Sequence, residues 1–358
     1  MRNYLQTIDA DTLLNTPIPP ARFVVDMLLP AGLHILAGAP KTGKSWLALW
    51  LCLCVSKGEP LWSFSTHRST ALYLCLEDSY ARIQKRLFQI TEDAPDTLYF
   101  ANLSGGIGSG LEEQLCAFLA EHPDTSLVVI DTLQKVRHPE ADINAYAGDY
   151  RDISVLKQLA DRHSIAILLV HHLRKMKDDD PMNMISGTTG ISGAADSSFV
   201  LKSDRRGSDF AMLYCTGRDI EYRELELRFE KGVWYLESDS AGTPELLEDP
   251  TLILLSEFLA QLGCFDGTAT ELSGLLKQRT GETMLPSVLS KKLVRYAKEL
   301  DDRGIRFSTS RTRDARLLHI LCIIRDGSDG NDGKNETAPC GEIAVTAVTP
   351  VTPACLPL

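Results

Sequence analysis

The stretch Leu33–Val55, LHILAGAPKTGKSWLALWLCLCV, decides the fold. It opens with the apolar run LHILAG, passes through a turn of small residues and closes on a second apolar run. The first run is typical of a buried strand. The second, Leu47–Val55, is typical of a buried helix and is too short to span a bilayer. The core of the chain is therefore expected to contain a strand, a glycine-containing turn and a helix in succession.

The turn fits the pattern G-x-x-x-x-G-K-[ST] between Gly38 and Ser45. Its glycines let backbone N–H groups point at a bound phosphate, and the following helix adds its positive N-terminal end. We expect Lys44 to reach the β- and γ-phosphates of ATP and the Ser45 hydroxyl to bind Mg²⁺. The expected cofactor-binding residues are Gly38, Ala39, Pro40, Lys41, Thr42, Gly43, Lys44, Ser45 and Trp46.

Composition and charge set limits on the class of protein. The chain has 358 residues, 44% of them hydrophobic, which suits a globular protein with one large and one small domain. The N-terminal residues lack an apolar signal core, so we expect a cytoplasmic protein with no membrane partner. Its nine cysteines contain no CxxC pair, so reduced structural thiols are expected rather than disulfides or zinc.

The net charge of −11 argues against general adhesion to nucleic acids. Local binding stays open, because basic residues cluster at 171–177, 202–206 and 310–316.

Apolar runs alternate with amphipathic stretches from Leu33 to about Glu237. This alternation predicts an α/β fold with a mostly parallel sheet covered on both faces. The last four runs, from Ser197 onward, follow one another closely and predict an antiparallel edge. We expect an extended lead-in (1–30), this α/β domain (31–238), a small winged-helix-like domain with three helices and a two-stranded wing (249–323), and a disordered tail (326–358).

Acidic residues and histidines end three of the predicted strands. Asp131 ends SLVVID, where an acid can hold the Mg²⁺ shell, although it could instead cap a helix. Glu77 ends TALYLCLE, where a carboxylate can take a proton from a water that attacks the γ-phosphate. A helix cap or a solvated acid is the alternative for Glu77, and Asp78 could cap the next helix.

Two histidines, His171 and His172, end IAILLVHH. A neutral imidazole there could donate to a γ-phosphate, and a structurally bonded histidine is the alternative. A dinuclear metal site is disfavoured, because no carboxylate lies at ligand spacing nearby.

These strand ends, in this order, resemble the RecA-type ATPase fold within the AAA family. They are most similar to RepA-like and DnaB-like hexameric replicative helicases, over about Pro30–Glu237. The resemblance implies a RecA-like P-loop NTPase core with Glu77 as catalytic base and Asp131 as the Mg²⁺-shell acid. His172 stands where most relatives have a sensor glutamine.

The hairpin LYCTGRDIEYRELELRFE looks like the one from which the family projects an arginine finger. Arg218 matches that finger, which reaches the γ-phosphate of the neighbouring subunit. The sequence departs from the DnaB-type pattern at Thr216, where a lysine often accompanies the arginine. The alternative for Arg218 is an ordinary surface residue of the hairpin.

The segment from Arg174 to Lys202 occupies the place of the family's inner DNA-binding loops. Its Gly187, Gly190 and Gly193 suit a mobile loop, and Arg174, Lys175 and Lys177 flank it; a linker without DNA contact is the alternative. Only about 30 residues precede the core, which favours the RepA-like branch or an ATPase of a plasmid, phage or integrated element. In the C-terminal domain, VLSKKLVRYAKEL is the candidate recognition helix, with an oligomer contact as the alternative.

Together these features favour an ATP-driven DNA translocase or helicase that acts on single strands as a homo-oligomeric, hexameric ring. A replication-initiation protein is a further candidate partner. The rival interpretation is a RecA-like, DNA-dependent ATPase that regulates replication or recombination without unwinding. A small-molecule kinase is disfavoured because Glu77, Asp131 and Arg218 form a hydrolysis set. The candidate base at Glu77 also argues against a non-hydrolysing switch.

Overall fold

The computed structural model describes residues 7–18, 21–137, 145–174, 178, 180–187, 189–203, 205, 207–241, 249–312 and 316–323. The expected tail at 326–358 and the loop residues Lys175 and Lys177 lie outside this described part. The chain divides into a larger unit, Ile18–Glu248, and a smaller unit formed by Met1–Pro17 together with Asp249–Leu358. None of the described helices is long and apolar enough to cross a membrane.

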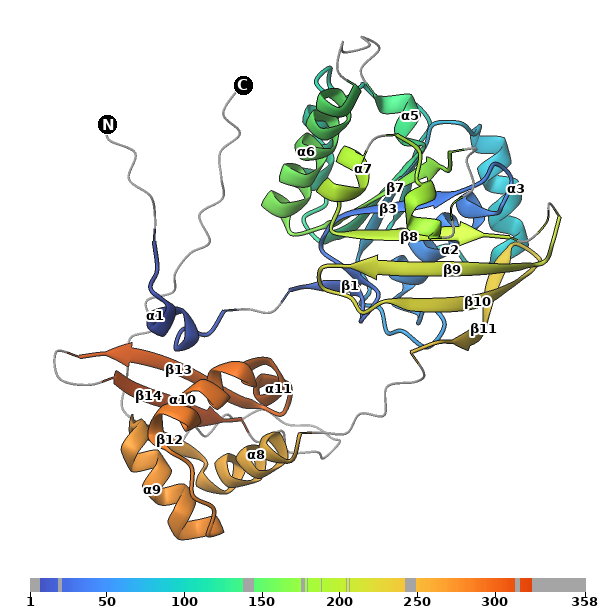
Figure 1. Ribbon diagram of the computed structural model, residues 1–358. Helices are drawn as coiled ribbons and strands as arrows, with labels where there is room; N and C mark the ends of the chain where they lie inside the picture. The colour runs from blue at the N-terminus through green and yellow to red at the C-terminus, as the bar shows by residue number, and fades with distance from the viewer. Residues whose placement is uncertain are drawn as a thin grey trace, which may run out of the picture. The chain divides into compact units, whose positions relative to one another are not determined.

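The larger unit is built on a sheet of nine described strands in the order β11-β10-β9-β8-β3-β7-β6-β4-β5 (Figure 1). The six strands from β8 to β5 are parallel, and β9, β10 and β11 continue the sheet in antiparallel fashion. The predicted α/β fold with an antiparallel edge is thus confirmed. The strands are β3 (Gly32–Gly38), β4 (Thr70–Cys75), β5 (Leu98–Ala101), β6 (Thr125–Asp131), β7 (Ala166–His172), β8 (Ser197–Lys202), β9 (Phe210–Gly217), β10 (Arg223–Glu230) and β11 (Val233–Asp239).

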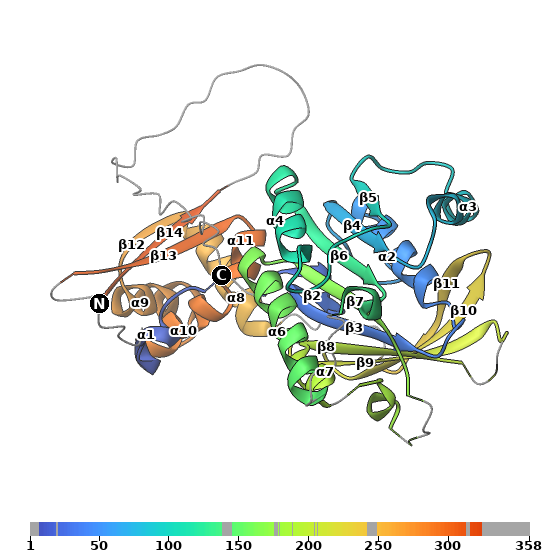
Figure 2. The ribbon, with the colours of Figure 1, turned by 90° about the horizontal axis from the view of Figure 1, so that it is seen from above.

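Helices cover both faces of this sheet (Figure 2). One face packs on α2 through residues such as Leu36 and Val170, and the other packs on α4 and α6 through residues such as Ile35 and Leu169. Alternate residues of each central strand therefore enter two separate apolar layers. The helices are α2 (Lys44–Lys57), α3 (Tyr80–Ile90), α4 (Leu111–Glu121), α5 (Leu133–Val136), α6 (Ala145–His163), η1 (Pro181–Met184) and α7 (Thr189–Ala194).

The stretch expected as an extended lead-in contributes to both units. Strands β1 (Phe23–Val25) and β2 (Leu29–Pro30) form a short antiparallel pair in the larger unit. They bury Val24, Val25 and Leu29 in the layer beneath α2, and this apolar burial explains why the segment is folded. Before them, α1 (Ala10–Leu14) belongs to the smaller unit, where the Ser290 hydroxyl donates to Asn15 Oδ1 at 3.4 Å.

The smaller unit packs helices against a three-stranded antiparallel sheet with the order β12-β14-β13. It differs from the expected three helices and two strands in two respects. A further strand, β12, precedes the second helix, and the expected third helix is divided at Tyr296 into α10 and α11. The elements are α8 (Pro250–Leu262), β12 (Cys264–Thr268), α9 (Ala269–Thr280), α10 (Pro286–Arg295), α11 (Ala297–Asp302), β13 (Ile305–Arg311) and β14 (Arg316–Cys322).

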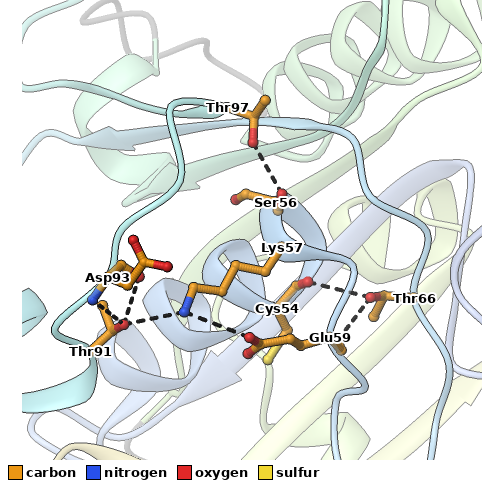
Figure 3. A network of polar contacts seen from close by, with 8 residues as sticks. All are labelled: Cys54, Ser56, Lys57, Glu59, Thr66, Thr91, Asp93 and Thr97. Atoms are coloured by element: carbon orange, nitrogen blue, oxygen red, sulfur yellow. Dashed lines mark hydrogen bonds and ion pairs between the residues drawn. The ribbon is translucent and has the colours of Figure 1, made fainter.

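The C-terminal end of α2 is closed by its neighbours, as Figure 3 shows. The carbonyl groups in the last turn of a helix have no partner within the helix. Here the Thr66 hydroxyl donates to the Cys54 carbonyl at 3.3 Å, and the Thr97 hydroxyl donates to the Ser56 carbonyl at 3.0 Å. Gly58 then ends the helix in the left-handed conformation, with φ of 70°. These contacts fix α2 at the end remote from the glycine turn.

Gly58 provides a stability test with a matched control. A Cβ at Gly58 would lie 3.0 Å from the backbone nitrogen of Arg68, whereas Gly108 has the same φ of 70° and nothing within 4 Å. Gly108→Ala is expected to lower the free energy of unfolding by about 1 kcal/mol, the cost of a left-handed residue. Gly58→Ala is expected to cost at least about 2 kcal/mol, because the contact with Arg68 is added. Equal losses in urea unfolding would contradict the steric argument.

Candidate functional site

The parallel register brings the strand ends singled out by the sequence to one edge of the sheet. Gly38 pairs with His172 across β3 and β7, and Asp131 pairs with Cys75 across β6 and β4. Asp131 also pairs with Val170, two residues before His172. The carboxyl ends of parallel strands are where ligands gather in such sheets. The candidate residues from four different strands are therefore brought together.

Strand alternation separates the two histidines. His172 lies in register with Leu168 and Val170 on the face that packs against α2, the face that also carries Asp131. His171 lies on the other face, where its Nε2 is 3.0 Å from the Ser186 carbonyl. Burial lowers the pKa of His171, so this ring is neutral at pH 7. Of the pair, only His172 is on the face of the glycine turn.

Lys44 is almost fully buried at the start of α2. Its ammonium donates to the carbonyls of Gly38 and Ala39 at 2.8 and 2.9 Å, and its exposed fraction is 6%. Burial lowers the pKa of Lys44 to about 8, against the opposing influence of Asp131 and Glu77. These two hydrogen bonds hold the side chain over its own loop, close enough to Asp131 and Glu77 for their charges to act on it.

A tryptophan on a distant strand supports the glycine turn. The indole N–H of Trp234, on β11, donates to the Gly43 carbonyl at 3.2 Å. Gly43 has φ of 89°, and a Cβ there would lie 2.7 Å from the Trp234 ring. Only glycine fits this position, both for its conformation and for the close approach of the ring. The sequence gives no signal for Trp234, since its contact depends on how the edge strands pair.

Asp131 is buried and held by two hydroxyl groups. The Tyr73 hydroxyl donates to Asp131 Oδ2 at 2.7 Å, and the Ser45 hydroxyl is also hydrogen-bonded to this carboxyl group. Burial raises the pKa of Asp131, and the two hydrogen bonds oppose that rise. A carboxylate next to a hydroxyl is an oxygen donor set that suits Mg²⁺. Tyr73 was not predicted, although its position two residues before Cys75 on β4 places it on the same face.

Glu77 and Asp78 have different surroundings beyond the end of β4. Glu77 is exposed, and its Oε1 accepts a hydrogen bond from the Thr132 hydroxyl at 3.2 Å. Asp78 accepts from Arg82 at 2.6 Å and from Arg86 at 2.5 Å. The side chain that caps α3 is that of Ser79, so the expectation that Asp78 could cap this helix is wrong. Among the described residues, Glu77 is thus the carboxylate of this pair that forms no ion pair with an arginine.

A cavity of about 670 Å³ adjoins the glycine turn in the described part of the larger unit. One side is formed by residues 39–46, and the other by aromatic side chains and the loop between β8 and β9. Arg86 lies over the Trp46 ring at 5.3 Å from its centre, and Trp46 meets Phe229 edge-on. The cavity residues beyond the predicted turn are Arg86, Ser203, Arg205, Gly207, Ser208, Asp209, Phe229 and Trp234. None of them was predicted, because the edge strands bring them here.

Arg218 lies at the opposite edge of the sheet from the glycine turn. It follows β9, and its backbone N–H donates to the Asp196 carbonyl at 2.9 Å. Asp196 lies beside Leu33 at the start of β3, and the distance along β3 from Leu33 to Gly38 is roughly 16 Å. The Arg218 guanidinium is 62% exposed and 3.6 Å from the Asp196 carboxylate. This side chain does not approach the glycine turn of its own chain.

The expected mobile loop at 174–202 is in part folded. The backbone N–H of Arg174 donates to the Met184 carbonyl at 2.8 Å, which closes the segment into a loop at the end of β7. Gly190 and Gly193 lie in α7, which buries Ile191 in the layer beneath α6. That apolar contact explains why a glycine-rich segment forms a short helix. Arg174 is half exposed and pairs with Asp178 at 3.5 Å.

The lowered pKa of Lys44 leads to a pH dependence of nucleotide binding. Phosphates bind the ammonium form of Lys44, so a bound nucleotide raises the pKa of this group above 8. Nucleotide affinity is therefore highest below pH 8 and falls as the pH rises above 8. We expect binding of a fluorescent ADP analogue to be about tenfold weaker at pH 9 than at pH 7. Arginine stays charged over this range, so the Kd of Lys44→Arg should be nearly the same at pH 9 as at pH 7. An unchanged Kd for the wild-type protein over this range would contradict the assignment.

Comparison with known proteins shows which proteins parts of this chain resemble. A search of curated proteins found no match. Among 454 matching chains of solved structures are "ATPase Domain of G40P" and "The Structure Of A DnaB-Like Replicative Helicase And Its Interactions With Primase". Both are 15% identical with a TM-score of 0.48 and cover 57% of this chain; 84% of the first chain and 58% of the second are covered. The family model for the AAA domain matches residues 3–178, which include the glycine turn, Glu77, Asp131 and His172. Residues 3–178 of this chain are therefore similar to the AAA domain.

Proposed function

We propose that this chain is an ATP-hydrolysing, RepA-like DNA translocase or helicase that works as a homo-oligomeric ring, for replication of a plasmid, phage or integrated element. One observation carries the hydrolytic part of this proposal. Lys44, Ser45, Asp131 and Glu77 lie at one edge of the sheet, where Lys44 and Ser45 also line a cavity of about 670 Å³. A buried cation, a hydroxyl–carboxylate pair and an unpaired carboxylate are the groups that ATP hydrolysis requires.

In this mechanism each group has a separate task. Lys44 neutralises charge on the β- and γ-phosphates. Ser45 and Asp131 would hold Mg²⁺, which would supply further charge neutralisation. Glu77 takes the proton of a water whose oxygen attacks the γ-phosphorus, while the bond to the β–γ bridging oxygen breaks. The Thr132 hydroxyl orients the Glu77 carboxylate. His172, on the same face, serves as the sensor of the γ-phosphate.

The position of Arg218 supports a site shared between subunits. Because it lies roughly one strand length from its own glycine turn, its guanidinium can complete a phosphate site only on another copy of the chain. A ring in which each subunit supplies Arg218 to the next satisfies this geometry with one repeated contact. An arginine supplied in trans stabilises transition-state charge and is worth about 10³–10⁵ in rate. A hexamer is the ring size we propose.

DNA is the proposed cargo, and the segment at 174–202 is the proposed contact. Arg174 is half exposed at the start of this segment, and Gly193 lies beside the Arg218 guanidinium at its end. The segment therefore begins with an exposed basic residue, Arg174, and also contacts Arg218 through Gly193. Single-stranded DNA is the form we propose, since a flexible strand can follow the centre of a ring.

The catalytic base is tested by Glu77→Gln. We expect turnover of ATP to fall by about 10²–10⁴, the contribution of a general base, with nucleotide affinity within about twofold of wild type. Glu113→Gln, at an exposed position on α4, is the control and should leave the rate unchanged. A steady-state phosphate-release assay measures both. Wild-type turnover in Glu77→Gln would exclude this residue as the base.

The shared site is tested by mixing two inactive variants. Arg218→Ala keeps its own Lys44, and Lys44→Ala keeps its own Arg218, so a mixed ring contains some complete sites. An equal mixture is expected to recover about a quarter of wild-type ATPase activity if neighbouring subunits combine at random. Each variant alone should be inactive. An inactive mixture of subunits shown to co-assemble would rule out the trans arrangement.

Whether hydrolysis drives unwinding is tested by strand displacement on forked DNA. The proposal predicts displacement with ATP, and ATPase activity that rises when single-stranded DNA is added. Lys44→Ala should show neither. ATPase stimulation without displacement would instead favour the rival function, a DNA-dependent ATPase that regulates replication or recombination.

A further inference from the structure

One part of the smaller unit, residues 249–325, is basic, although the whole chain is acidic. Residues 249–325 contain twelve Lys and Arg against nine Asp and Glu, whereas the whole chain has 37 against 48. This asymmetry points to a partner for the smaller unit that carries negative charge. The positions of the exposed Lys and Arg side chains on the helices and strands show where such a partner could bind.

Helix α10 carries a row of exposed cations. Its buried side, which includes Leu289 and Leu293, packs into the core of the smaller unit. Lys291 and Arg295 lie on the opposite side, and Lys298 continues the row on α11; all three are exposed. Among the described residues, no carboxylate pairs with any of them. Over seven residues this row extends about 10 Å.

A second cationic feature lies at the end of the hairpin formed by β13 and β14. Arg311 and Arg316 are directly opposite each other across the two strands. Like charges in this position repel and destabilise a hairpin. Within the described part of the chain, neither guanidinium has an acidic partner. An anion bound between or beside the two arginines would remove this repulsion.

We propose that α10 and the β13–β14 hairpin of the smaller unit bind duplex DNA. The supporting elements have the order of a helix-turn-helix followed by a hairpin, with α9 and α10 joined through residues 281–285. A helix of about 10–12 Å diameter fits the major groove, which is about 12 Å wide. Lys291, Arg295 and Lys298 contact the flanking phosphates, and the Arg311–Arg316 pair contacts the phosphate backbone beside them.

The hydrogen bond that joins α10 to the residue after α1 does not involve the cations of α10. The contact between the two helices is made through Ser290 and Asn15. Ser290 is buried and lies about 100° around the helix from Lys291. A duplex is favoured over an acidic protein, because its phosphates repeat along its length and can meet both the helix row and the hairpin pair. This proposal requires no nucleotide and is independent of the ATPase proposal.

The test compares the full chain with Lys291→Ala/Arg295→Ala in nucleotide-free solution. Binding of a short labelled duplex is measured by fluorescence anisotropy over a series of salt concentrations, with one strand of that duplex as the second ligand. We expect the double variant to bind the duplex at least tenfold more weakly near 0.1 M salt. The slope of log K against log salt should fall by about 2, because each phosphate contact contributes about 0.9.

Two further variants keep the test decisive. Arg311→Ala/Arg316→Ala should weaken duplex binding in the same way. Arg68→Ala/Lys85→Ala removes two exposed cations of the larger unit and should leave duplex binding unchanged. Because all these side chains reach the surface, no variant should melt below the wild-type temperature, and basal ATPase activity should stay at the wild-type value.

Three results would overturn the proposal. The first is unchanged duplex affinity in both variants of the smaller unit. The second is an equal loss for the duplex and the single strand, or an equal loss in the Arg68/Lys85 control. The third is a changed assembly mass in light scattering with duplex affinity retained, which would make this face a contact between copies of the chain.

Discussion

Parallel pairing of β3 with β7, of β7 with β6 and of β6 with β4 is the constraint on which the candidate site depends. Side chains alternate along a strand, so the register decides which of them face α2. A slip of one residue in β6 would turn Asp131 away from Tyr73 and Ser45. The same slip would exchange the apolar residues of β6 between the two buried layers, where their side chains would no longer fit their neighbours. The burial of both faces therefore fixes the register, and the register fixes the site.

Helix α2 fixes the position of the glycine turn relative to the sheet, because both ends of the helix are hydrogen-bonded to neighbouring segments. At its C-terminal end, Thr66 and Thr97 bond carbonyls of the last turn. At its N-terminal end, Trp234 bonds the Gly43 carbonyl from the antiparallel edge of the sheet. The helix between them is buried on nearly all sides. The edge strands, whose β9–β10 hairpin also carries Arg218, thus support the loop on which nucleotide binding would depend.

The sequence predicted the features that depend on local patterns. The apolar runs and the glycine turn placed the strands and α2, and the polar residues after each run marked the strand ends. Tyr73, Arg86 and Trp234 were missed because their contacts arise from pairing between distant segments. The division of 174–202 into a closed loop and α7 was missed for a related reason. Its glycine-rich composition favours a loop, and only the burial of Ile191 against α6 overrides that preference.

Asp196 links β3, α6 and Arg218 at the edge of the sheet opposite the glycine turn. Its carboxylate accepts hydrogen bonds from the Leu33 N–H at 2.9 Å and pairs with Lys157 at 2.9 Å, so it ties the start of β3 to α6. The same carboxylate lies 3.6 Å from the Arg218 guanidinium, which also donates to the Gly193 carbonyl of α7 at 3.4 Å. A displacement of α7 would therefore move the groups that orient Arg218. In the proposed ring, DNA bound at the 174–202 segment could therefore change the position of Arg218, which acts at the phosphate site of the next subunit.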